Sequence, residues 1–326
     1  MSGTVIGNYR IICKLGEGGM GQVFRAIDVT LQREVAIKIL HPYLTQDEAM
    51  LQRFRAEAIT LAKLNHPNIA LLYSFIEHGD ECFMVMEYVP GETLESLLRR
   101  CGALPLRQAL ELFCQVLRGF EHAHAKSVIH RDIKPSNVML REDGQVKITD
   151  FGIARVLGAT KLTRTGRLIG TPEYMSPEQI QGREQDARSD IYSLGILLYE
   201  MVTGRVPFSG ASDFEIMRAQ LDSSSPSARD LIAGLPSEVE TSIRKALEKD
   251  PEARFQSVEQ FRQTLEPVIE RLPATGQRIL PQTPTVPETR IVNSPDGVIL
   301  KETRLADRTG AEAASLPFAT TNARQD

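Results

Sequence analysis

Two short stretches decide the fold of this chain: HRDIKPSN at residues 130–137 and DFG at residues 150–152. Each contains a tripeptide that occurs often by chance, so neither is informative alone. Their meaning depends on which other motifs precede them, and in which order. Two such motifs lie upstream, the glycine-rich GEGGMGQV at residues 16–23 and VAIK at residues 35–38.

The glycine-rich stretch lies between two strand-like segments. Gly16, Gly18 and Gly21 would let the backbone approach a phosphate group closely, because glycine has no Cβ. The same spacing also marks dinucleotide-binding folds and many plain turns. A dinucleotide site needs a helix directly after the glycines, whereas a further strand, Gln22–Val29, is expected here. The order of elements therefore argues against a dinucleotide site.

Lys38 lies in the apolar strand Arg33–Leu40. Such a lysine is usually an edge or snorkelling side chain. The glycine-rich turn upstream changes that interpretation, because the ammonium group could then reach the phosphates of a nucleotide. A carboxylate from the following helix would hold it in place, and Glu57 is the candidate by position. The alternative is that Glu57 is one more solvated helix charge, like Glu48.

Taken in this order, the four motifs resemble those of the eukaryotic-type protein kinases, over roughly residues 9–270. The resemblance implies an α+β fold of two lobes: a small five-stranded antiparallel sheet with one helix, then a larger, mainly helical lobe. Ser176-Pro177-Glu178 stands where the family usually has Ala-Pro-Glu. This variant, with GGMG and IGTP elsewhere, is similar to the bacterial eukaryote-like serine/threonine kinases of the Hanks type.

By this resemblance the chain would transfer the γ-phosphate of ATP to serine and threonine hydroxyls of protein substrates. Asp132 would accept or orient the hydroxyl proton, and Lys134 would balance charge on the transferred phosphate. Asn137 and Asp150 would hold Mg²⁺, with Mn²⁺ as an alternative, because both metals favour hard oxygen ligands. Lys38 and Glu57 complete the expected catalytic set.

The resemblance also implies an ATP pocket. Val23 and Ala36 would cover the adenine, Met139 would lie below it, and Met86 would guard the back of the pocket. Glu87 to Val89 would supply backbone hydrogen bonds. Core packing is the alternative for all of these side chains. The full expected set is Leu15, Gly16, Gly18, Gly21, Val23, Ala36, Lys38, Met86, Glu87, Val89 and Met139.

The segment between Asp150 and Glu178 suggests control by phosphorylation. Thr163 and Thr165 match loop positions that related bacterial kinases phosphorylate on themselves, and Arg131 and Arg155 would receive the phosphate through charge-assisted bonds. Polar loop residues without this role are the alternative. Three structural roles also follow from the resemblance: Thr171 contacts Asp132 or Lys134, Glu178 pairs with Arg254, and Asp190 holds the backbone of the catalytic loop, which contains the motif at residues 130–137.

The pattern along the chain predicts three regions. Residues 1–88 form the small lobe, with strands at Tyr9–Leu15, Gln22–Val29, Arg33–Leu40, Ala70–Ile76 and Cys82–Tyr88 around a helix at Glu48–Leu64. Residues 89–271 form the large lobe, with helices at Leu106–Ala125, Arg188–Thr203, Ser237–Leu247 and Val258–Glu270, and short strands at Val138–Leu140 and Val146–Ile148.

Residues 272–326 form a tail rich in proline and threonine, which we expect to be disordered because it offers little apolar surface to bury. A juxtamembrane-type linker is the alternative for this region. Phosphorylation of its threonines would recruit phosphothreonine-binding partners. The candidate sites are Thr283, Thr285 and Thr289.

Composition restricts the partners and the compartment. The 326 residues include 38 basic and 42 acidic side chains, a net charge of -4 that gives no reason to expect nucleic acid. The four cysteines form no C-x-x-C pair, and no segment reaches the roughly 18 apolar residues of a membrane-spanning helix. We expect a cytoplasmic protein, or the cytoplasmic part of a membrane-anchored kinase if the chain is truncated. Homodimerisation through the small lobe, common among relatives, stays open.

Three rival functions are weaker. A pseudokinase usually lacks the strand lysine or one of the two catalytic aspartates, but Lys38, Asp132 and Asp150 are present. Small-molecule phosphotransferases of similar fold generally lack a long segment ending in Pro-Glu. A phosphopeptide-binding adaptor would depend on the tail, which would act alongside catalysis here.

Overall fold

The computed structural model of this chain describes residues 4–18, 21–45, 48–78, 81–151, 171–274, 279–282, 288–293 and 299–304. The chain forms two compact units, Met1–Gln282 and Thr283–Asp326. The first contains both lobes that the sequence predicts.

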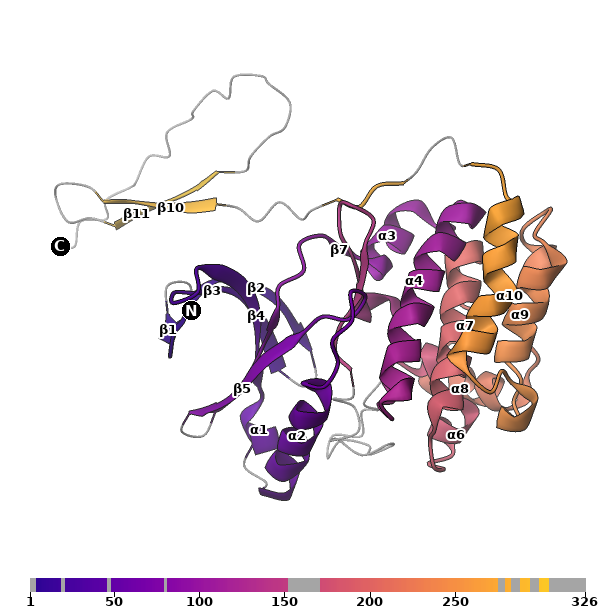
Figure 1. The fold of residues 1–326 in the computed structure, drawn as a ribbon, viewed down its shortest axis with the longest axis horizontal. Coiled ribbons are helices and arrows are strands. Elements are labelled where there is room, and N and C mark those ends of the chain that lie inside the picture. Colours follow the sequence, from indigo (N-terminus) through magenta and orange to yellow (C-terminus); the bar gives the residue numbers. More distant parts are fainter. Residues whose placement is uncertain are drawn as a thin grey trace, which may run out of the picture. The chain divides into compact units, whose positions relative to one another are not determined.

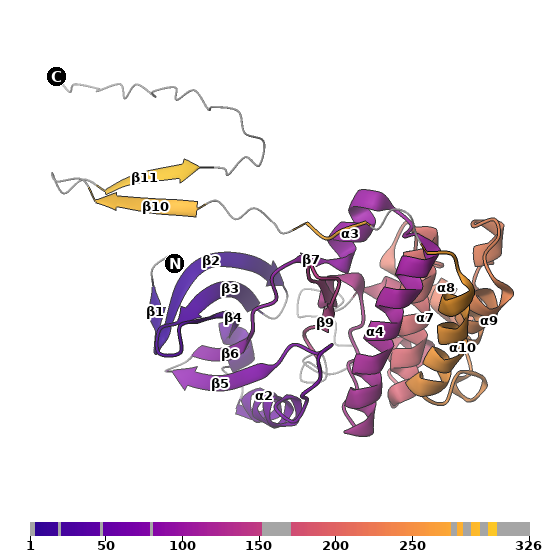
Figure 2. The same ribbon diagram turned by 45° about the horizontal axis from the view of Figure 1, so that its top comes forward.

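The small lobe is built on a twisted antiparallel sheet (Figures 1 and 2). Its strand order is β1-β2-β3-β4-β6-β5. Five long strands match the sheet expected from the sequence, and the two-residue β1 adds a sixth at one edge. The strands are β1 (Val5–Ile6), β2 (Tyr9–Gly18), β3 (Gly21–Asp28), β4 (Arg33–Leu40), β5 (Leu72–His78) and β6 (Glu81–Glu87).

Both faces of this sheet are covered because its side chains alternate in direction. On β6, Cys82 and Met84 belong to one buried cluster together with Phe54 of helix α2 (Glu48–Leu61). The neighbouring Phe83 and Val85 belong to a second cluster on the opposite face. The short helix α1 (Pro42–Thr45) precedes α2.

The large lobe is mainly helical, and α7 lies at its centre with nearly every residue buried. Helices α4, α9 and α10 pack beside α7 or one another (Figure 2). The helices are α3 (Leu94–Cys101), α4 (Leu106–Ala125), α6 (Pro177–Ile180), α7 (Ala187–Thr203), α8 (Asp213–Asp222), α9 (Ser237–Ala246) and α10 (Val258–Arg271). Short 3₁₀ helices are η1 (Pro135–Asn137), η2 (Pro172–Tyr174), η3 (Ala228–Asp230) and η4 (Pro251–Ala253).

A second small sheet connects the lobes. It contains β7 (Glu92–Thr93), β8 (Val138–Leu140) and β9 (Val146–Ile148), in that order. A parallel bridge joins Ile148 to Ile69, which lies between α2 and β5. The motif at residues 130–137 therefore lies directly before β8, and DFG follows β9.

Beyond residue 274, the structure describes two parts of the region predicted as a disordered tail. Residues Ile279–Gln282 pack on the large lobe. In the second unit, β10 (Glu288–Asn293) and β11 (Ile299–Arg304) form an antiparallel hairpin, with Glu288 opposite Arg304. Apart from residues 272–274, the remaining residues of the tail lie outside the described part. Within the described ranges, no helix is both long and apolar enough to cross a bilayer.

Candidate active site

The glycines between β2 and β3 divide into two kinds. A Cβ added at Gly16 or Gly18 would meet no atom within 4 Å, so their backbone borders open space where a phosphate could approach. Gly21 has φ +155°, and a Cβ there would lie 1.9 Å from the carbonyl oxygen of Ile39. This third glycine is therefore required by the packing of β3 on β4.

Strand register brings the expected pocket residues side by side. Val23 on β3 is opposite Lys38 on β4, and Ala36 is opposite Met86 on β6. Leu15, at the edge of this group, is 42% exposed. Met139 lies on β8 of the second sheet, so the enclosure of adenine between Val23, Ala36 and Met139 stays a prediction.

At the end of β6 and just after it, one of the backbone groups expected to contact adenine already has another partner. The Glu87 amide donates to the carbonyl oxygen of Leu71 at 2.8 Å, so this N–H is already used. The carbonyl group of Glu87 and the backbone of Val89 remain as candidates. The Val89 side chain is buried.

Lys38 and Asp150 join the two lobes. Lys38 is 6% exposed, and its Nζ donates to Asp150 Oδ1 at 2.8 Å. Burial opposes ionisation of Asp150, but the Lys38 ammonium outweighs it and lowers the pKa of this carboxyl group below its ordinary value. Glu57 is also buried, on α2. Among the described residues the ion pair of Lys38 is with Asp150, so the Lys38–Glu57 pair stays a prediction.

Three side chains of the catalytic loop contact one another. Lys134 Nζ lies 2.8 Å from Asp132 Oδ2, and Asn137 Nδ2 donates to the backbone oxygen of Asp132 at 2.8 Å. The amide nitrogen of Asn137 is thus turned towards Asp132, and its Oδ1 accepts no hydrogen bond from the described residues. This oxygen and the Asp150 carboxylate are hard oxygen groups of the kind that divalent metal ions bind in proteins.

Asp190 of α7 fixes the backbone of this loop through hydrogen bonds. Its carboxylate accepts the backbone N–H groups of His130 and Arg131, each at 2.9 Å, and contacts His124 Nε2 at 2.8 Å. Arg131 has φ 68°, a left-handed conformation that is costly for arginine. The buried carboxylate fixes this strained turn, and the turn presents Asp132. Burial opposes ionisation of Asp190, but His124 and the other donors lower its pKa.

Phe151 is held by aromatic neighbours. Its ring lies 4.6 Å from the His130 ring and 5.3 Å from the Phe120 ring, measured between centroids. His130 Nε2 also lies 3.0 Å from the backbone oxygen of Thr149. The residues around Asp150 are therefore tied to the catalytic loop. Behind Met86, Phe151 also borders a cavity of about 30 Å³ together with Leu61.

The C-terminal end of the segment between Asp150 and Glu178, which we call the activation segment, is anchored by a buried ion pair. Arg254 Nη1 and Nη2 donate to the two oxygens of Glu178 at 2.8 and 2.9 Å, and Ser189 adds a third bond to Glu178. This is the pairing expected from the sequence. Gln179 also donates to the backbone oxygen of Arg131 at 2.8 Å, which ties the segment to the catalytic loop.

Other expectations for this segment are not met or lie outside the described residues. Within the described ranges, no hydrogen bond joins the Thr171 hydroxyl to Asp132 or Lys134. The positions of Thr163, Thr165 and Arg155 fall in the undescribed stretch 152–170.

Sequence reasoning missed two ties between the lobes. Lys147 is buried and donates to Glu87 Oε2 at 2.8 Å, connecting β9 to β6. The side-chain amide of Asn68 donates to the backbone oxygen of Val146, and the backbone oxygen of Asn68 accepts the N–H of Ile148. The contacting residues are far apart in sequence, so no local pattern signals either tie.

Comparison with known proteins identifies the family of this chain. A family model described as protein kinase domain matches residues 9–265. The serine/threonine-protein kinase PrkC of Bacillus subtilis is 42% identical over 255 residues, which are 78% of this chain and 39% of PrkC. The serine/threonine-protein kinase PknA of Mycobacterium tuberculosis is 42% identical over 259 residues, or 78% of this chain and 59% of PknA.

A solved structure gives the same fold. The kinase domain of PknI from Mycobacterium tuberculosis matches with a TM-score of 0.66 and 25% identity, covering 82% of this chain and 98% of that chain. The chain spans between two fifths and three fifths of the length of the curated relatives named above.

Fold and site together define the class of two-lobed protein kinases. Within that class, the chain belongs to the protein kinase family, in the group of bacterial eukaryote-like kinases of the Hanks type.

Proposed function

We propose that this chain is a serine/threonine protein kinase that transfers the γ-phosphate of Mg·ATP to protein hydroxyl groups. The observation that carries the proposal is the set of contacts joining Lys38 to Asp150 and Asp132 to Lys134 and Asn137. Family membership and the names of the relatives support it.

Each residue of this set has a chemical task. Asp132, held by the strained turn, orients the substrate hydroxyl and accepts its proton. Lys134, which lies against Asp132, offsets negative charge on the transferred group. Lys38 positions the nucleotide phosphates, and the open backbone at Gly16 and Gly18 leaves room for them. Because the transition state is loose, positioning and charge neutralisation account for most of the acceleration.

Asn137 and Asp150 would hold the magnesium ion. When bound, it would neutralise phosphate charge. The low pKa of Asp150 keeps this ligand ionised at neutral pH. Mn²⁺ could replace Mg²⁺ because it accepts the same oxygen ligands.

Activation would proceed through autophosphorylation of Thr163 or Thr165. Arg131 supports this proposal by its position, because it directly precedes Asp132 and its backbone is fixed by Asp190 and Gln179. A phosphothreonine bound to Arg131 and Arg155 would order the segment. The reaction would take place in the cytoplasm, carried out by a cytoplasmic protein or by the cytoplasmic part of a membrane-anchored kinase. Phosphothreonine-binding partners of the tail and a homodimer through the small lobe belong to the same proposal.

Phosphosite mapping after incubation with Mg·ATP tests the function and its control together. We expect phosphate on serine or threonine, including Thr163 or Thr165, and slower labelling of a generic substrate by the double variant T163A/T165A. Tyrosine as the main acceptor would contradict the hydroxyl preference. Active enzyme with both threonines unmodified would contradict the activation step.

A further inference from the structure

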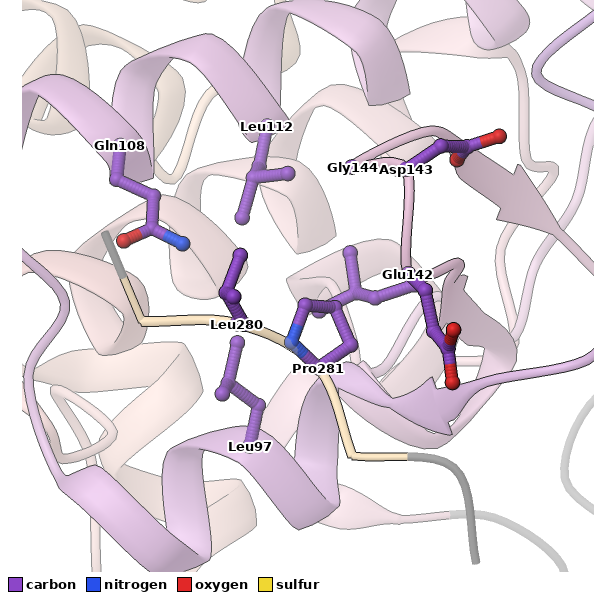
Figure 3. Close-up of a pocket in the computed structure, with 9 residues that line it drawn as sticks. Leu97, Gln108, Leu112, Glu142, Asp143, Gly144, Leu280 and Pro281 are labelled. Atoms are coloured by element: carbon purple, nitrogen blue, oxygen red, sulfur yellow. The ribbon is translucent and has the colours of Figure 1, made fainter.

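A groove on the large lobe holds a short segment of backbone from near the C-terminal end of the first unit. Its walls are α3, α4 and the turn between β8 and β9, and its occupant is Ile279–Gln282. Figure 3 shows Leu280 and Pro281 between Leu97 of α3 and Leu112 of α4. We refer to Ile279–Gln282 as the strap.

A buried side-chain amide in the groove forms two hydrogen bonds with the main chain of the strap. Gln108 of α4 is 2% exposed. Its Nε2 donates to the carbonyl oxygen of Ile279 at 2.7 Å, and its Oε1 accepts the N–H of the same residue at 3.0 Å. A buried amide left without partners carries the full cost of its desolvation. The groove therefore favours an extended backbone at this position.

Two further groove residues also bind only the main chain of the strap. Arg100 donates to the carbonyl oxygen of Leu280 at 3.2 Å, and Glu92 accepts the N–H of Gln282 at 2.9 Å. Arg100 and Glu92 are paired with each other at 2.6 Å, which fixes both. None of the four hydrogen bonds depends on the side chains of the strap, so another extended peptide could make the same bonds.

Side-chain selectivity lies in a shallow apolar part of the groove. Ile279 packs against the core of the large lobe, whereas Leu280 is 62% exposed. A cavity of about 30 Å³ remains beside Leu280 and Pro281, bordered by Leu97, Leu112 and Leu140. The strap fits the groove without filling it, so a related peptide could fit equally well.

We propose that this groove is a docking site for an extended apolar-Leu-Pro peptide of a partner protein, and that the strap occupies it as an intramolecular competitor. A segment tethered by a short linker has an effective concentration in the millimolar range. The partner peptide must therefore compete with the strap. Its occupancy of the groove would depend on how easily the strap dissociates.

The test uses the full chain and a labelled peptide with the sequence of residues 276–285, followed by fluorescence anisotropy. Ile279→Pro in the chain removes the N–H that Gln108 accepts and should free the groove. We expect the peptide to bind this variant roughly tenfold or more tighter than the unaltered chain. The same Ile279→Pro change placed in the peptide should abolish binding.

A second substitution locates the binding. Gln108→Glu, added to the Ile279→Pro chain, replaces the donor by a carboxylate oxygen and should weaken peptide binding about tenfold. Gln263→Glu, the same change at an exposed position of α10, is the matched control and should leave binding unchanged. Thermal unfolding verifies that each variant is folded.

Three outcomes would overturn the proposal. The peptide fails to bind the Ile279→Pro chain, or it binds equally well after Gln108→Glu. In the third, hydrogen exchange shows residues 279–282 still protected in the Ile279→Pro chain, so the pairing with Gln108 does not hold the strap. No ATP is used, so a negative result leaves the proposed kinase activity standing.

Discussion

Arg254 is the largest side chain that the described structure buries completely, and its charge is matched by Glu178. Removing one partner of a buried ion pair leaves the other uncompensated, which costs about 3–5 kcal/mol. We therefore expect Glu178→Gln to lower the free energy of unfolding by about that amount, measured by urea denaturation. Glu252→Gln, which removes an exposed partner of Arg188, is the control and should cost less than about 1 kcal/mol.

The same pair predicts a dependence on pH. Burial raises the pKa of Glu178, but Arg254 outweighs it, so the pKa lies below the ordinary value of 4.5. As pH falls below 4.5, the unfolded chain takes up the proton first, and the stabilisation by Glu178 is lost as pH approaches the folded pKa. The stability difference between wild type and Glu178→Gln should be constant at neutral pH and shrink in acid. A difference that grows in acid would contradict this assignment.

Lys249 predicts a second dependence on pH, in the alkaline range. Burial and the neighbouring Arg254 lower its pKa to about 8, from 10.5. Between these two values the unfolded chain binds more protons than the folded chain, so this group makes stability rise with pH. Relative to Lys249→Met, the wild-type protein should gain stability from pH 8 to pH 10 in thermal unfolding. A flat difference across that range would show that Lys249 keeps its charge when folded.

At the scale of elements, the β2–β3 hairpin contains one glycine that packing requires, Gly21, and one that borders open space, Gly18. Gly21→Ala would place a Cβ against the backbone of Ile39, so we expect a loss of stability of about 1–3 kcal/mol. Gly18→Ala meets open space and should leave the unfolding midpoint nearly unchanged, while raising the KM for ATP. The measurements are thermal unfolding and ATP-dependent kinetics. Equal destabilisation by both substitutions would contradict the division.

Sequence periodicity predicted the long elements well because their buried faces repeat regularly. The strands β2 to β6 and the helices α2, α4, α7, α9 and α10 were expected from that pattern. The helices α3 and α8 were not among the predicted elements. Each is short, and α8 buries only Ile216 and Gln220, which leaves little apolar pattern to detect.

For the whole molecule, the catalytic motifs were visible in the sequence because Asp132, Lys134 and Asn137 lie within one short stretch. Contacts between distant segments were not visible. The Lys147–Glu87 pair and the strap on Gln108 depend on how the lobes and the C-terminal segment fold back. The strap is held by one buried amide and two charged side chains, and the composition of the tail does not reveal these contacts.

The central claim is that Asp132 acts within an assembled site for phosphoryl transfer. The most direct test is incorporation of labelled γ-phosphate from Mg·ATP into a generic protein substrate, by the wild-type chain and by Asp132→Asn. We predict labelling by the wild type and a rate about 10²–10⁴ times lower for the variant, because the proton acceptor is lost. A wild-type chain that labels no protein, or a variant that labels as fast, would contradict the account.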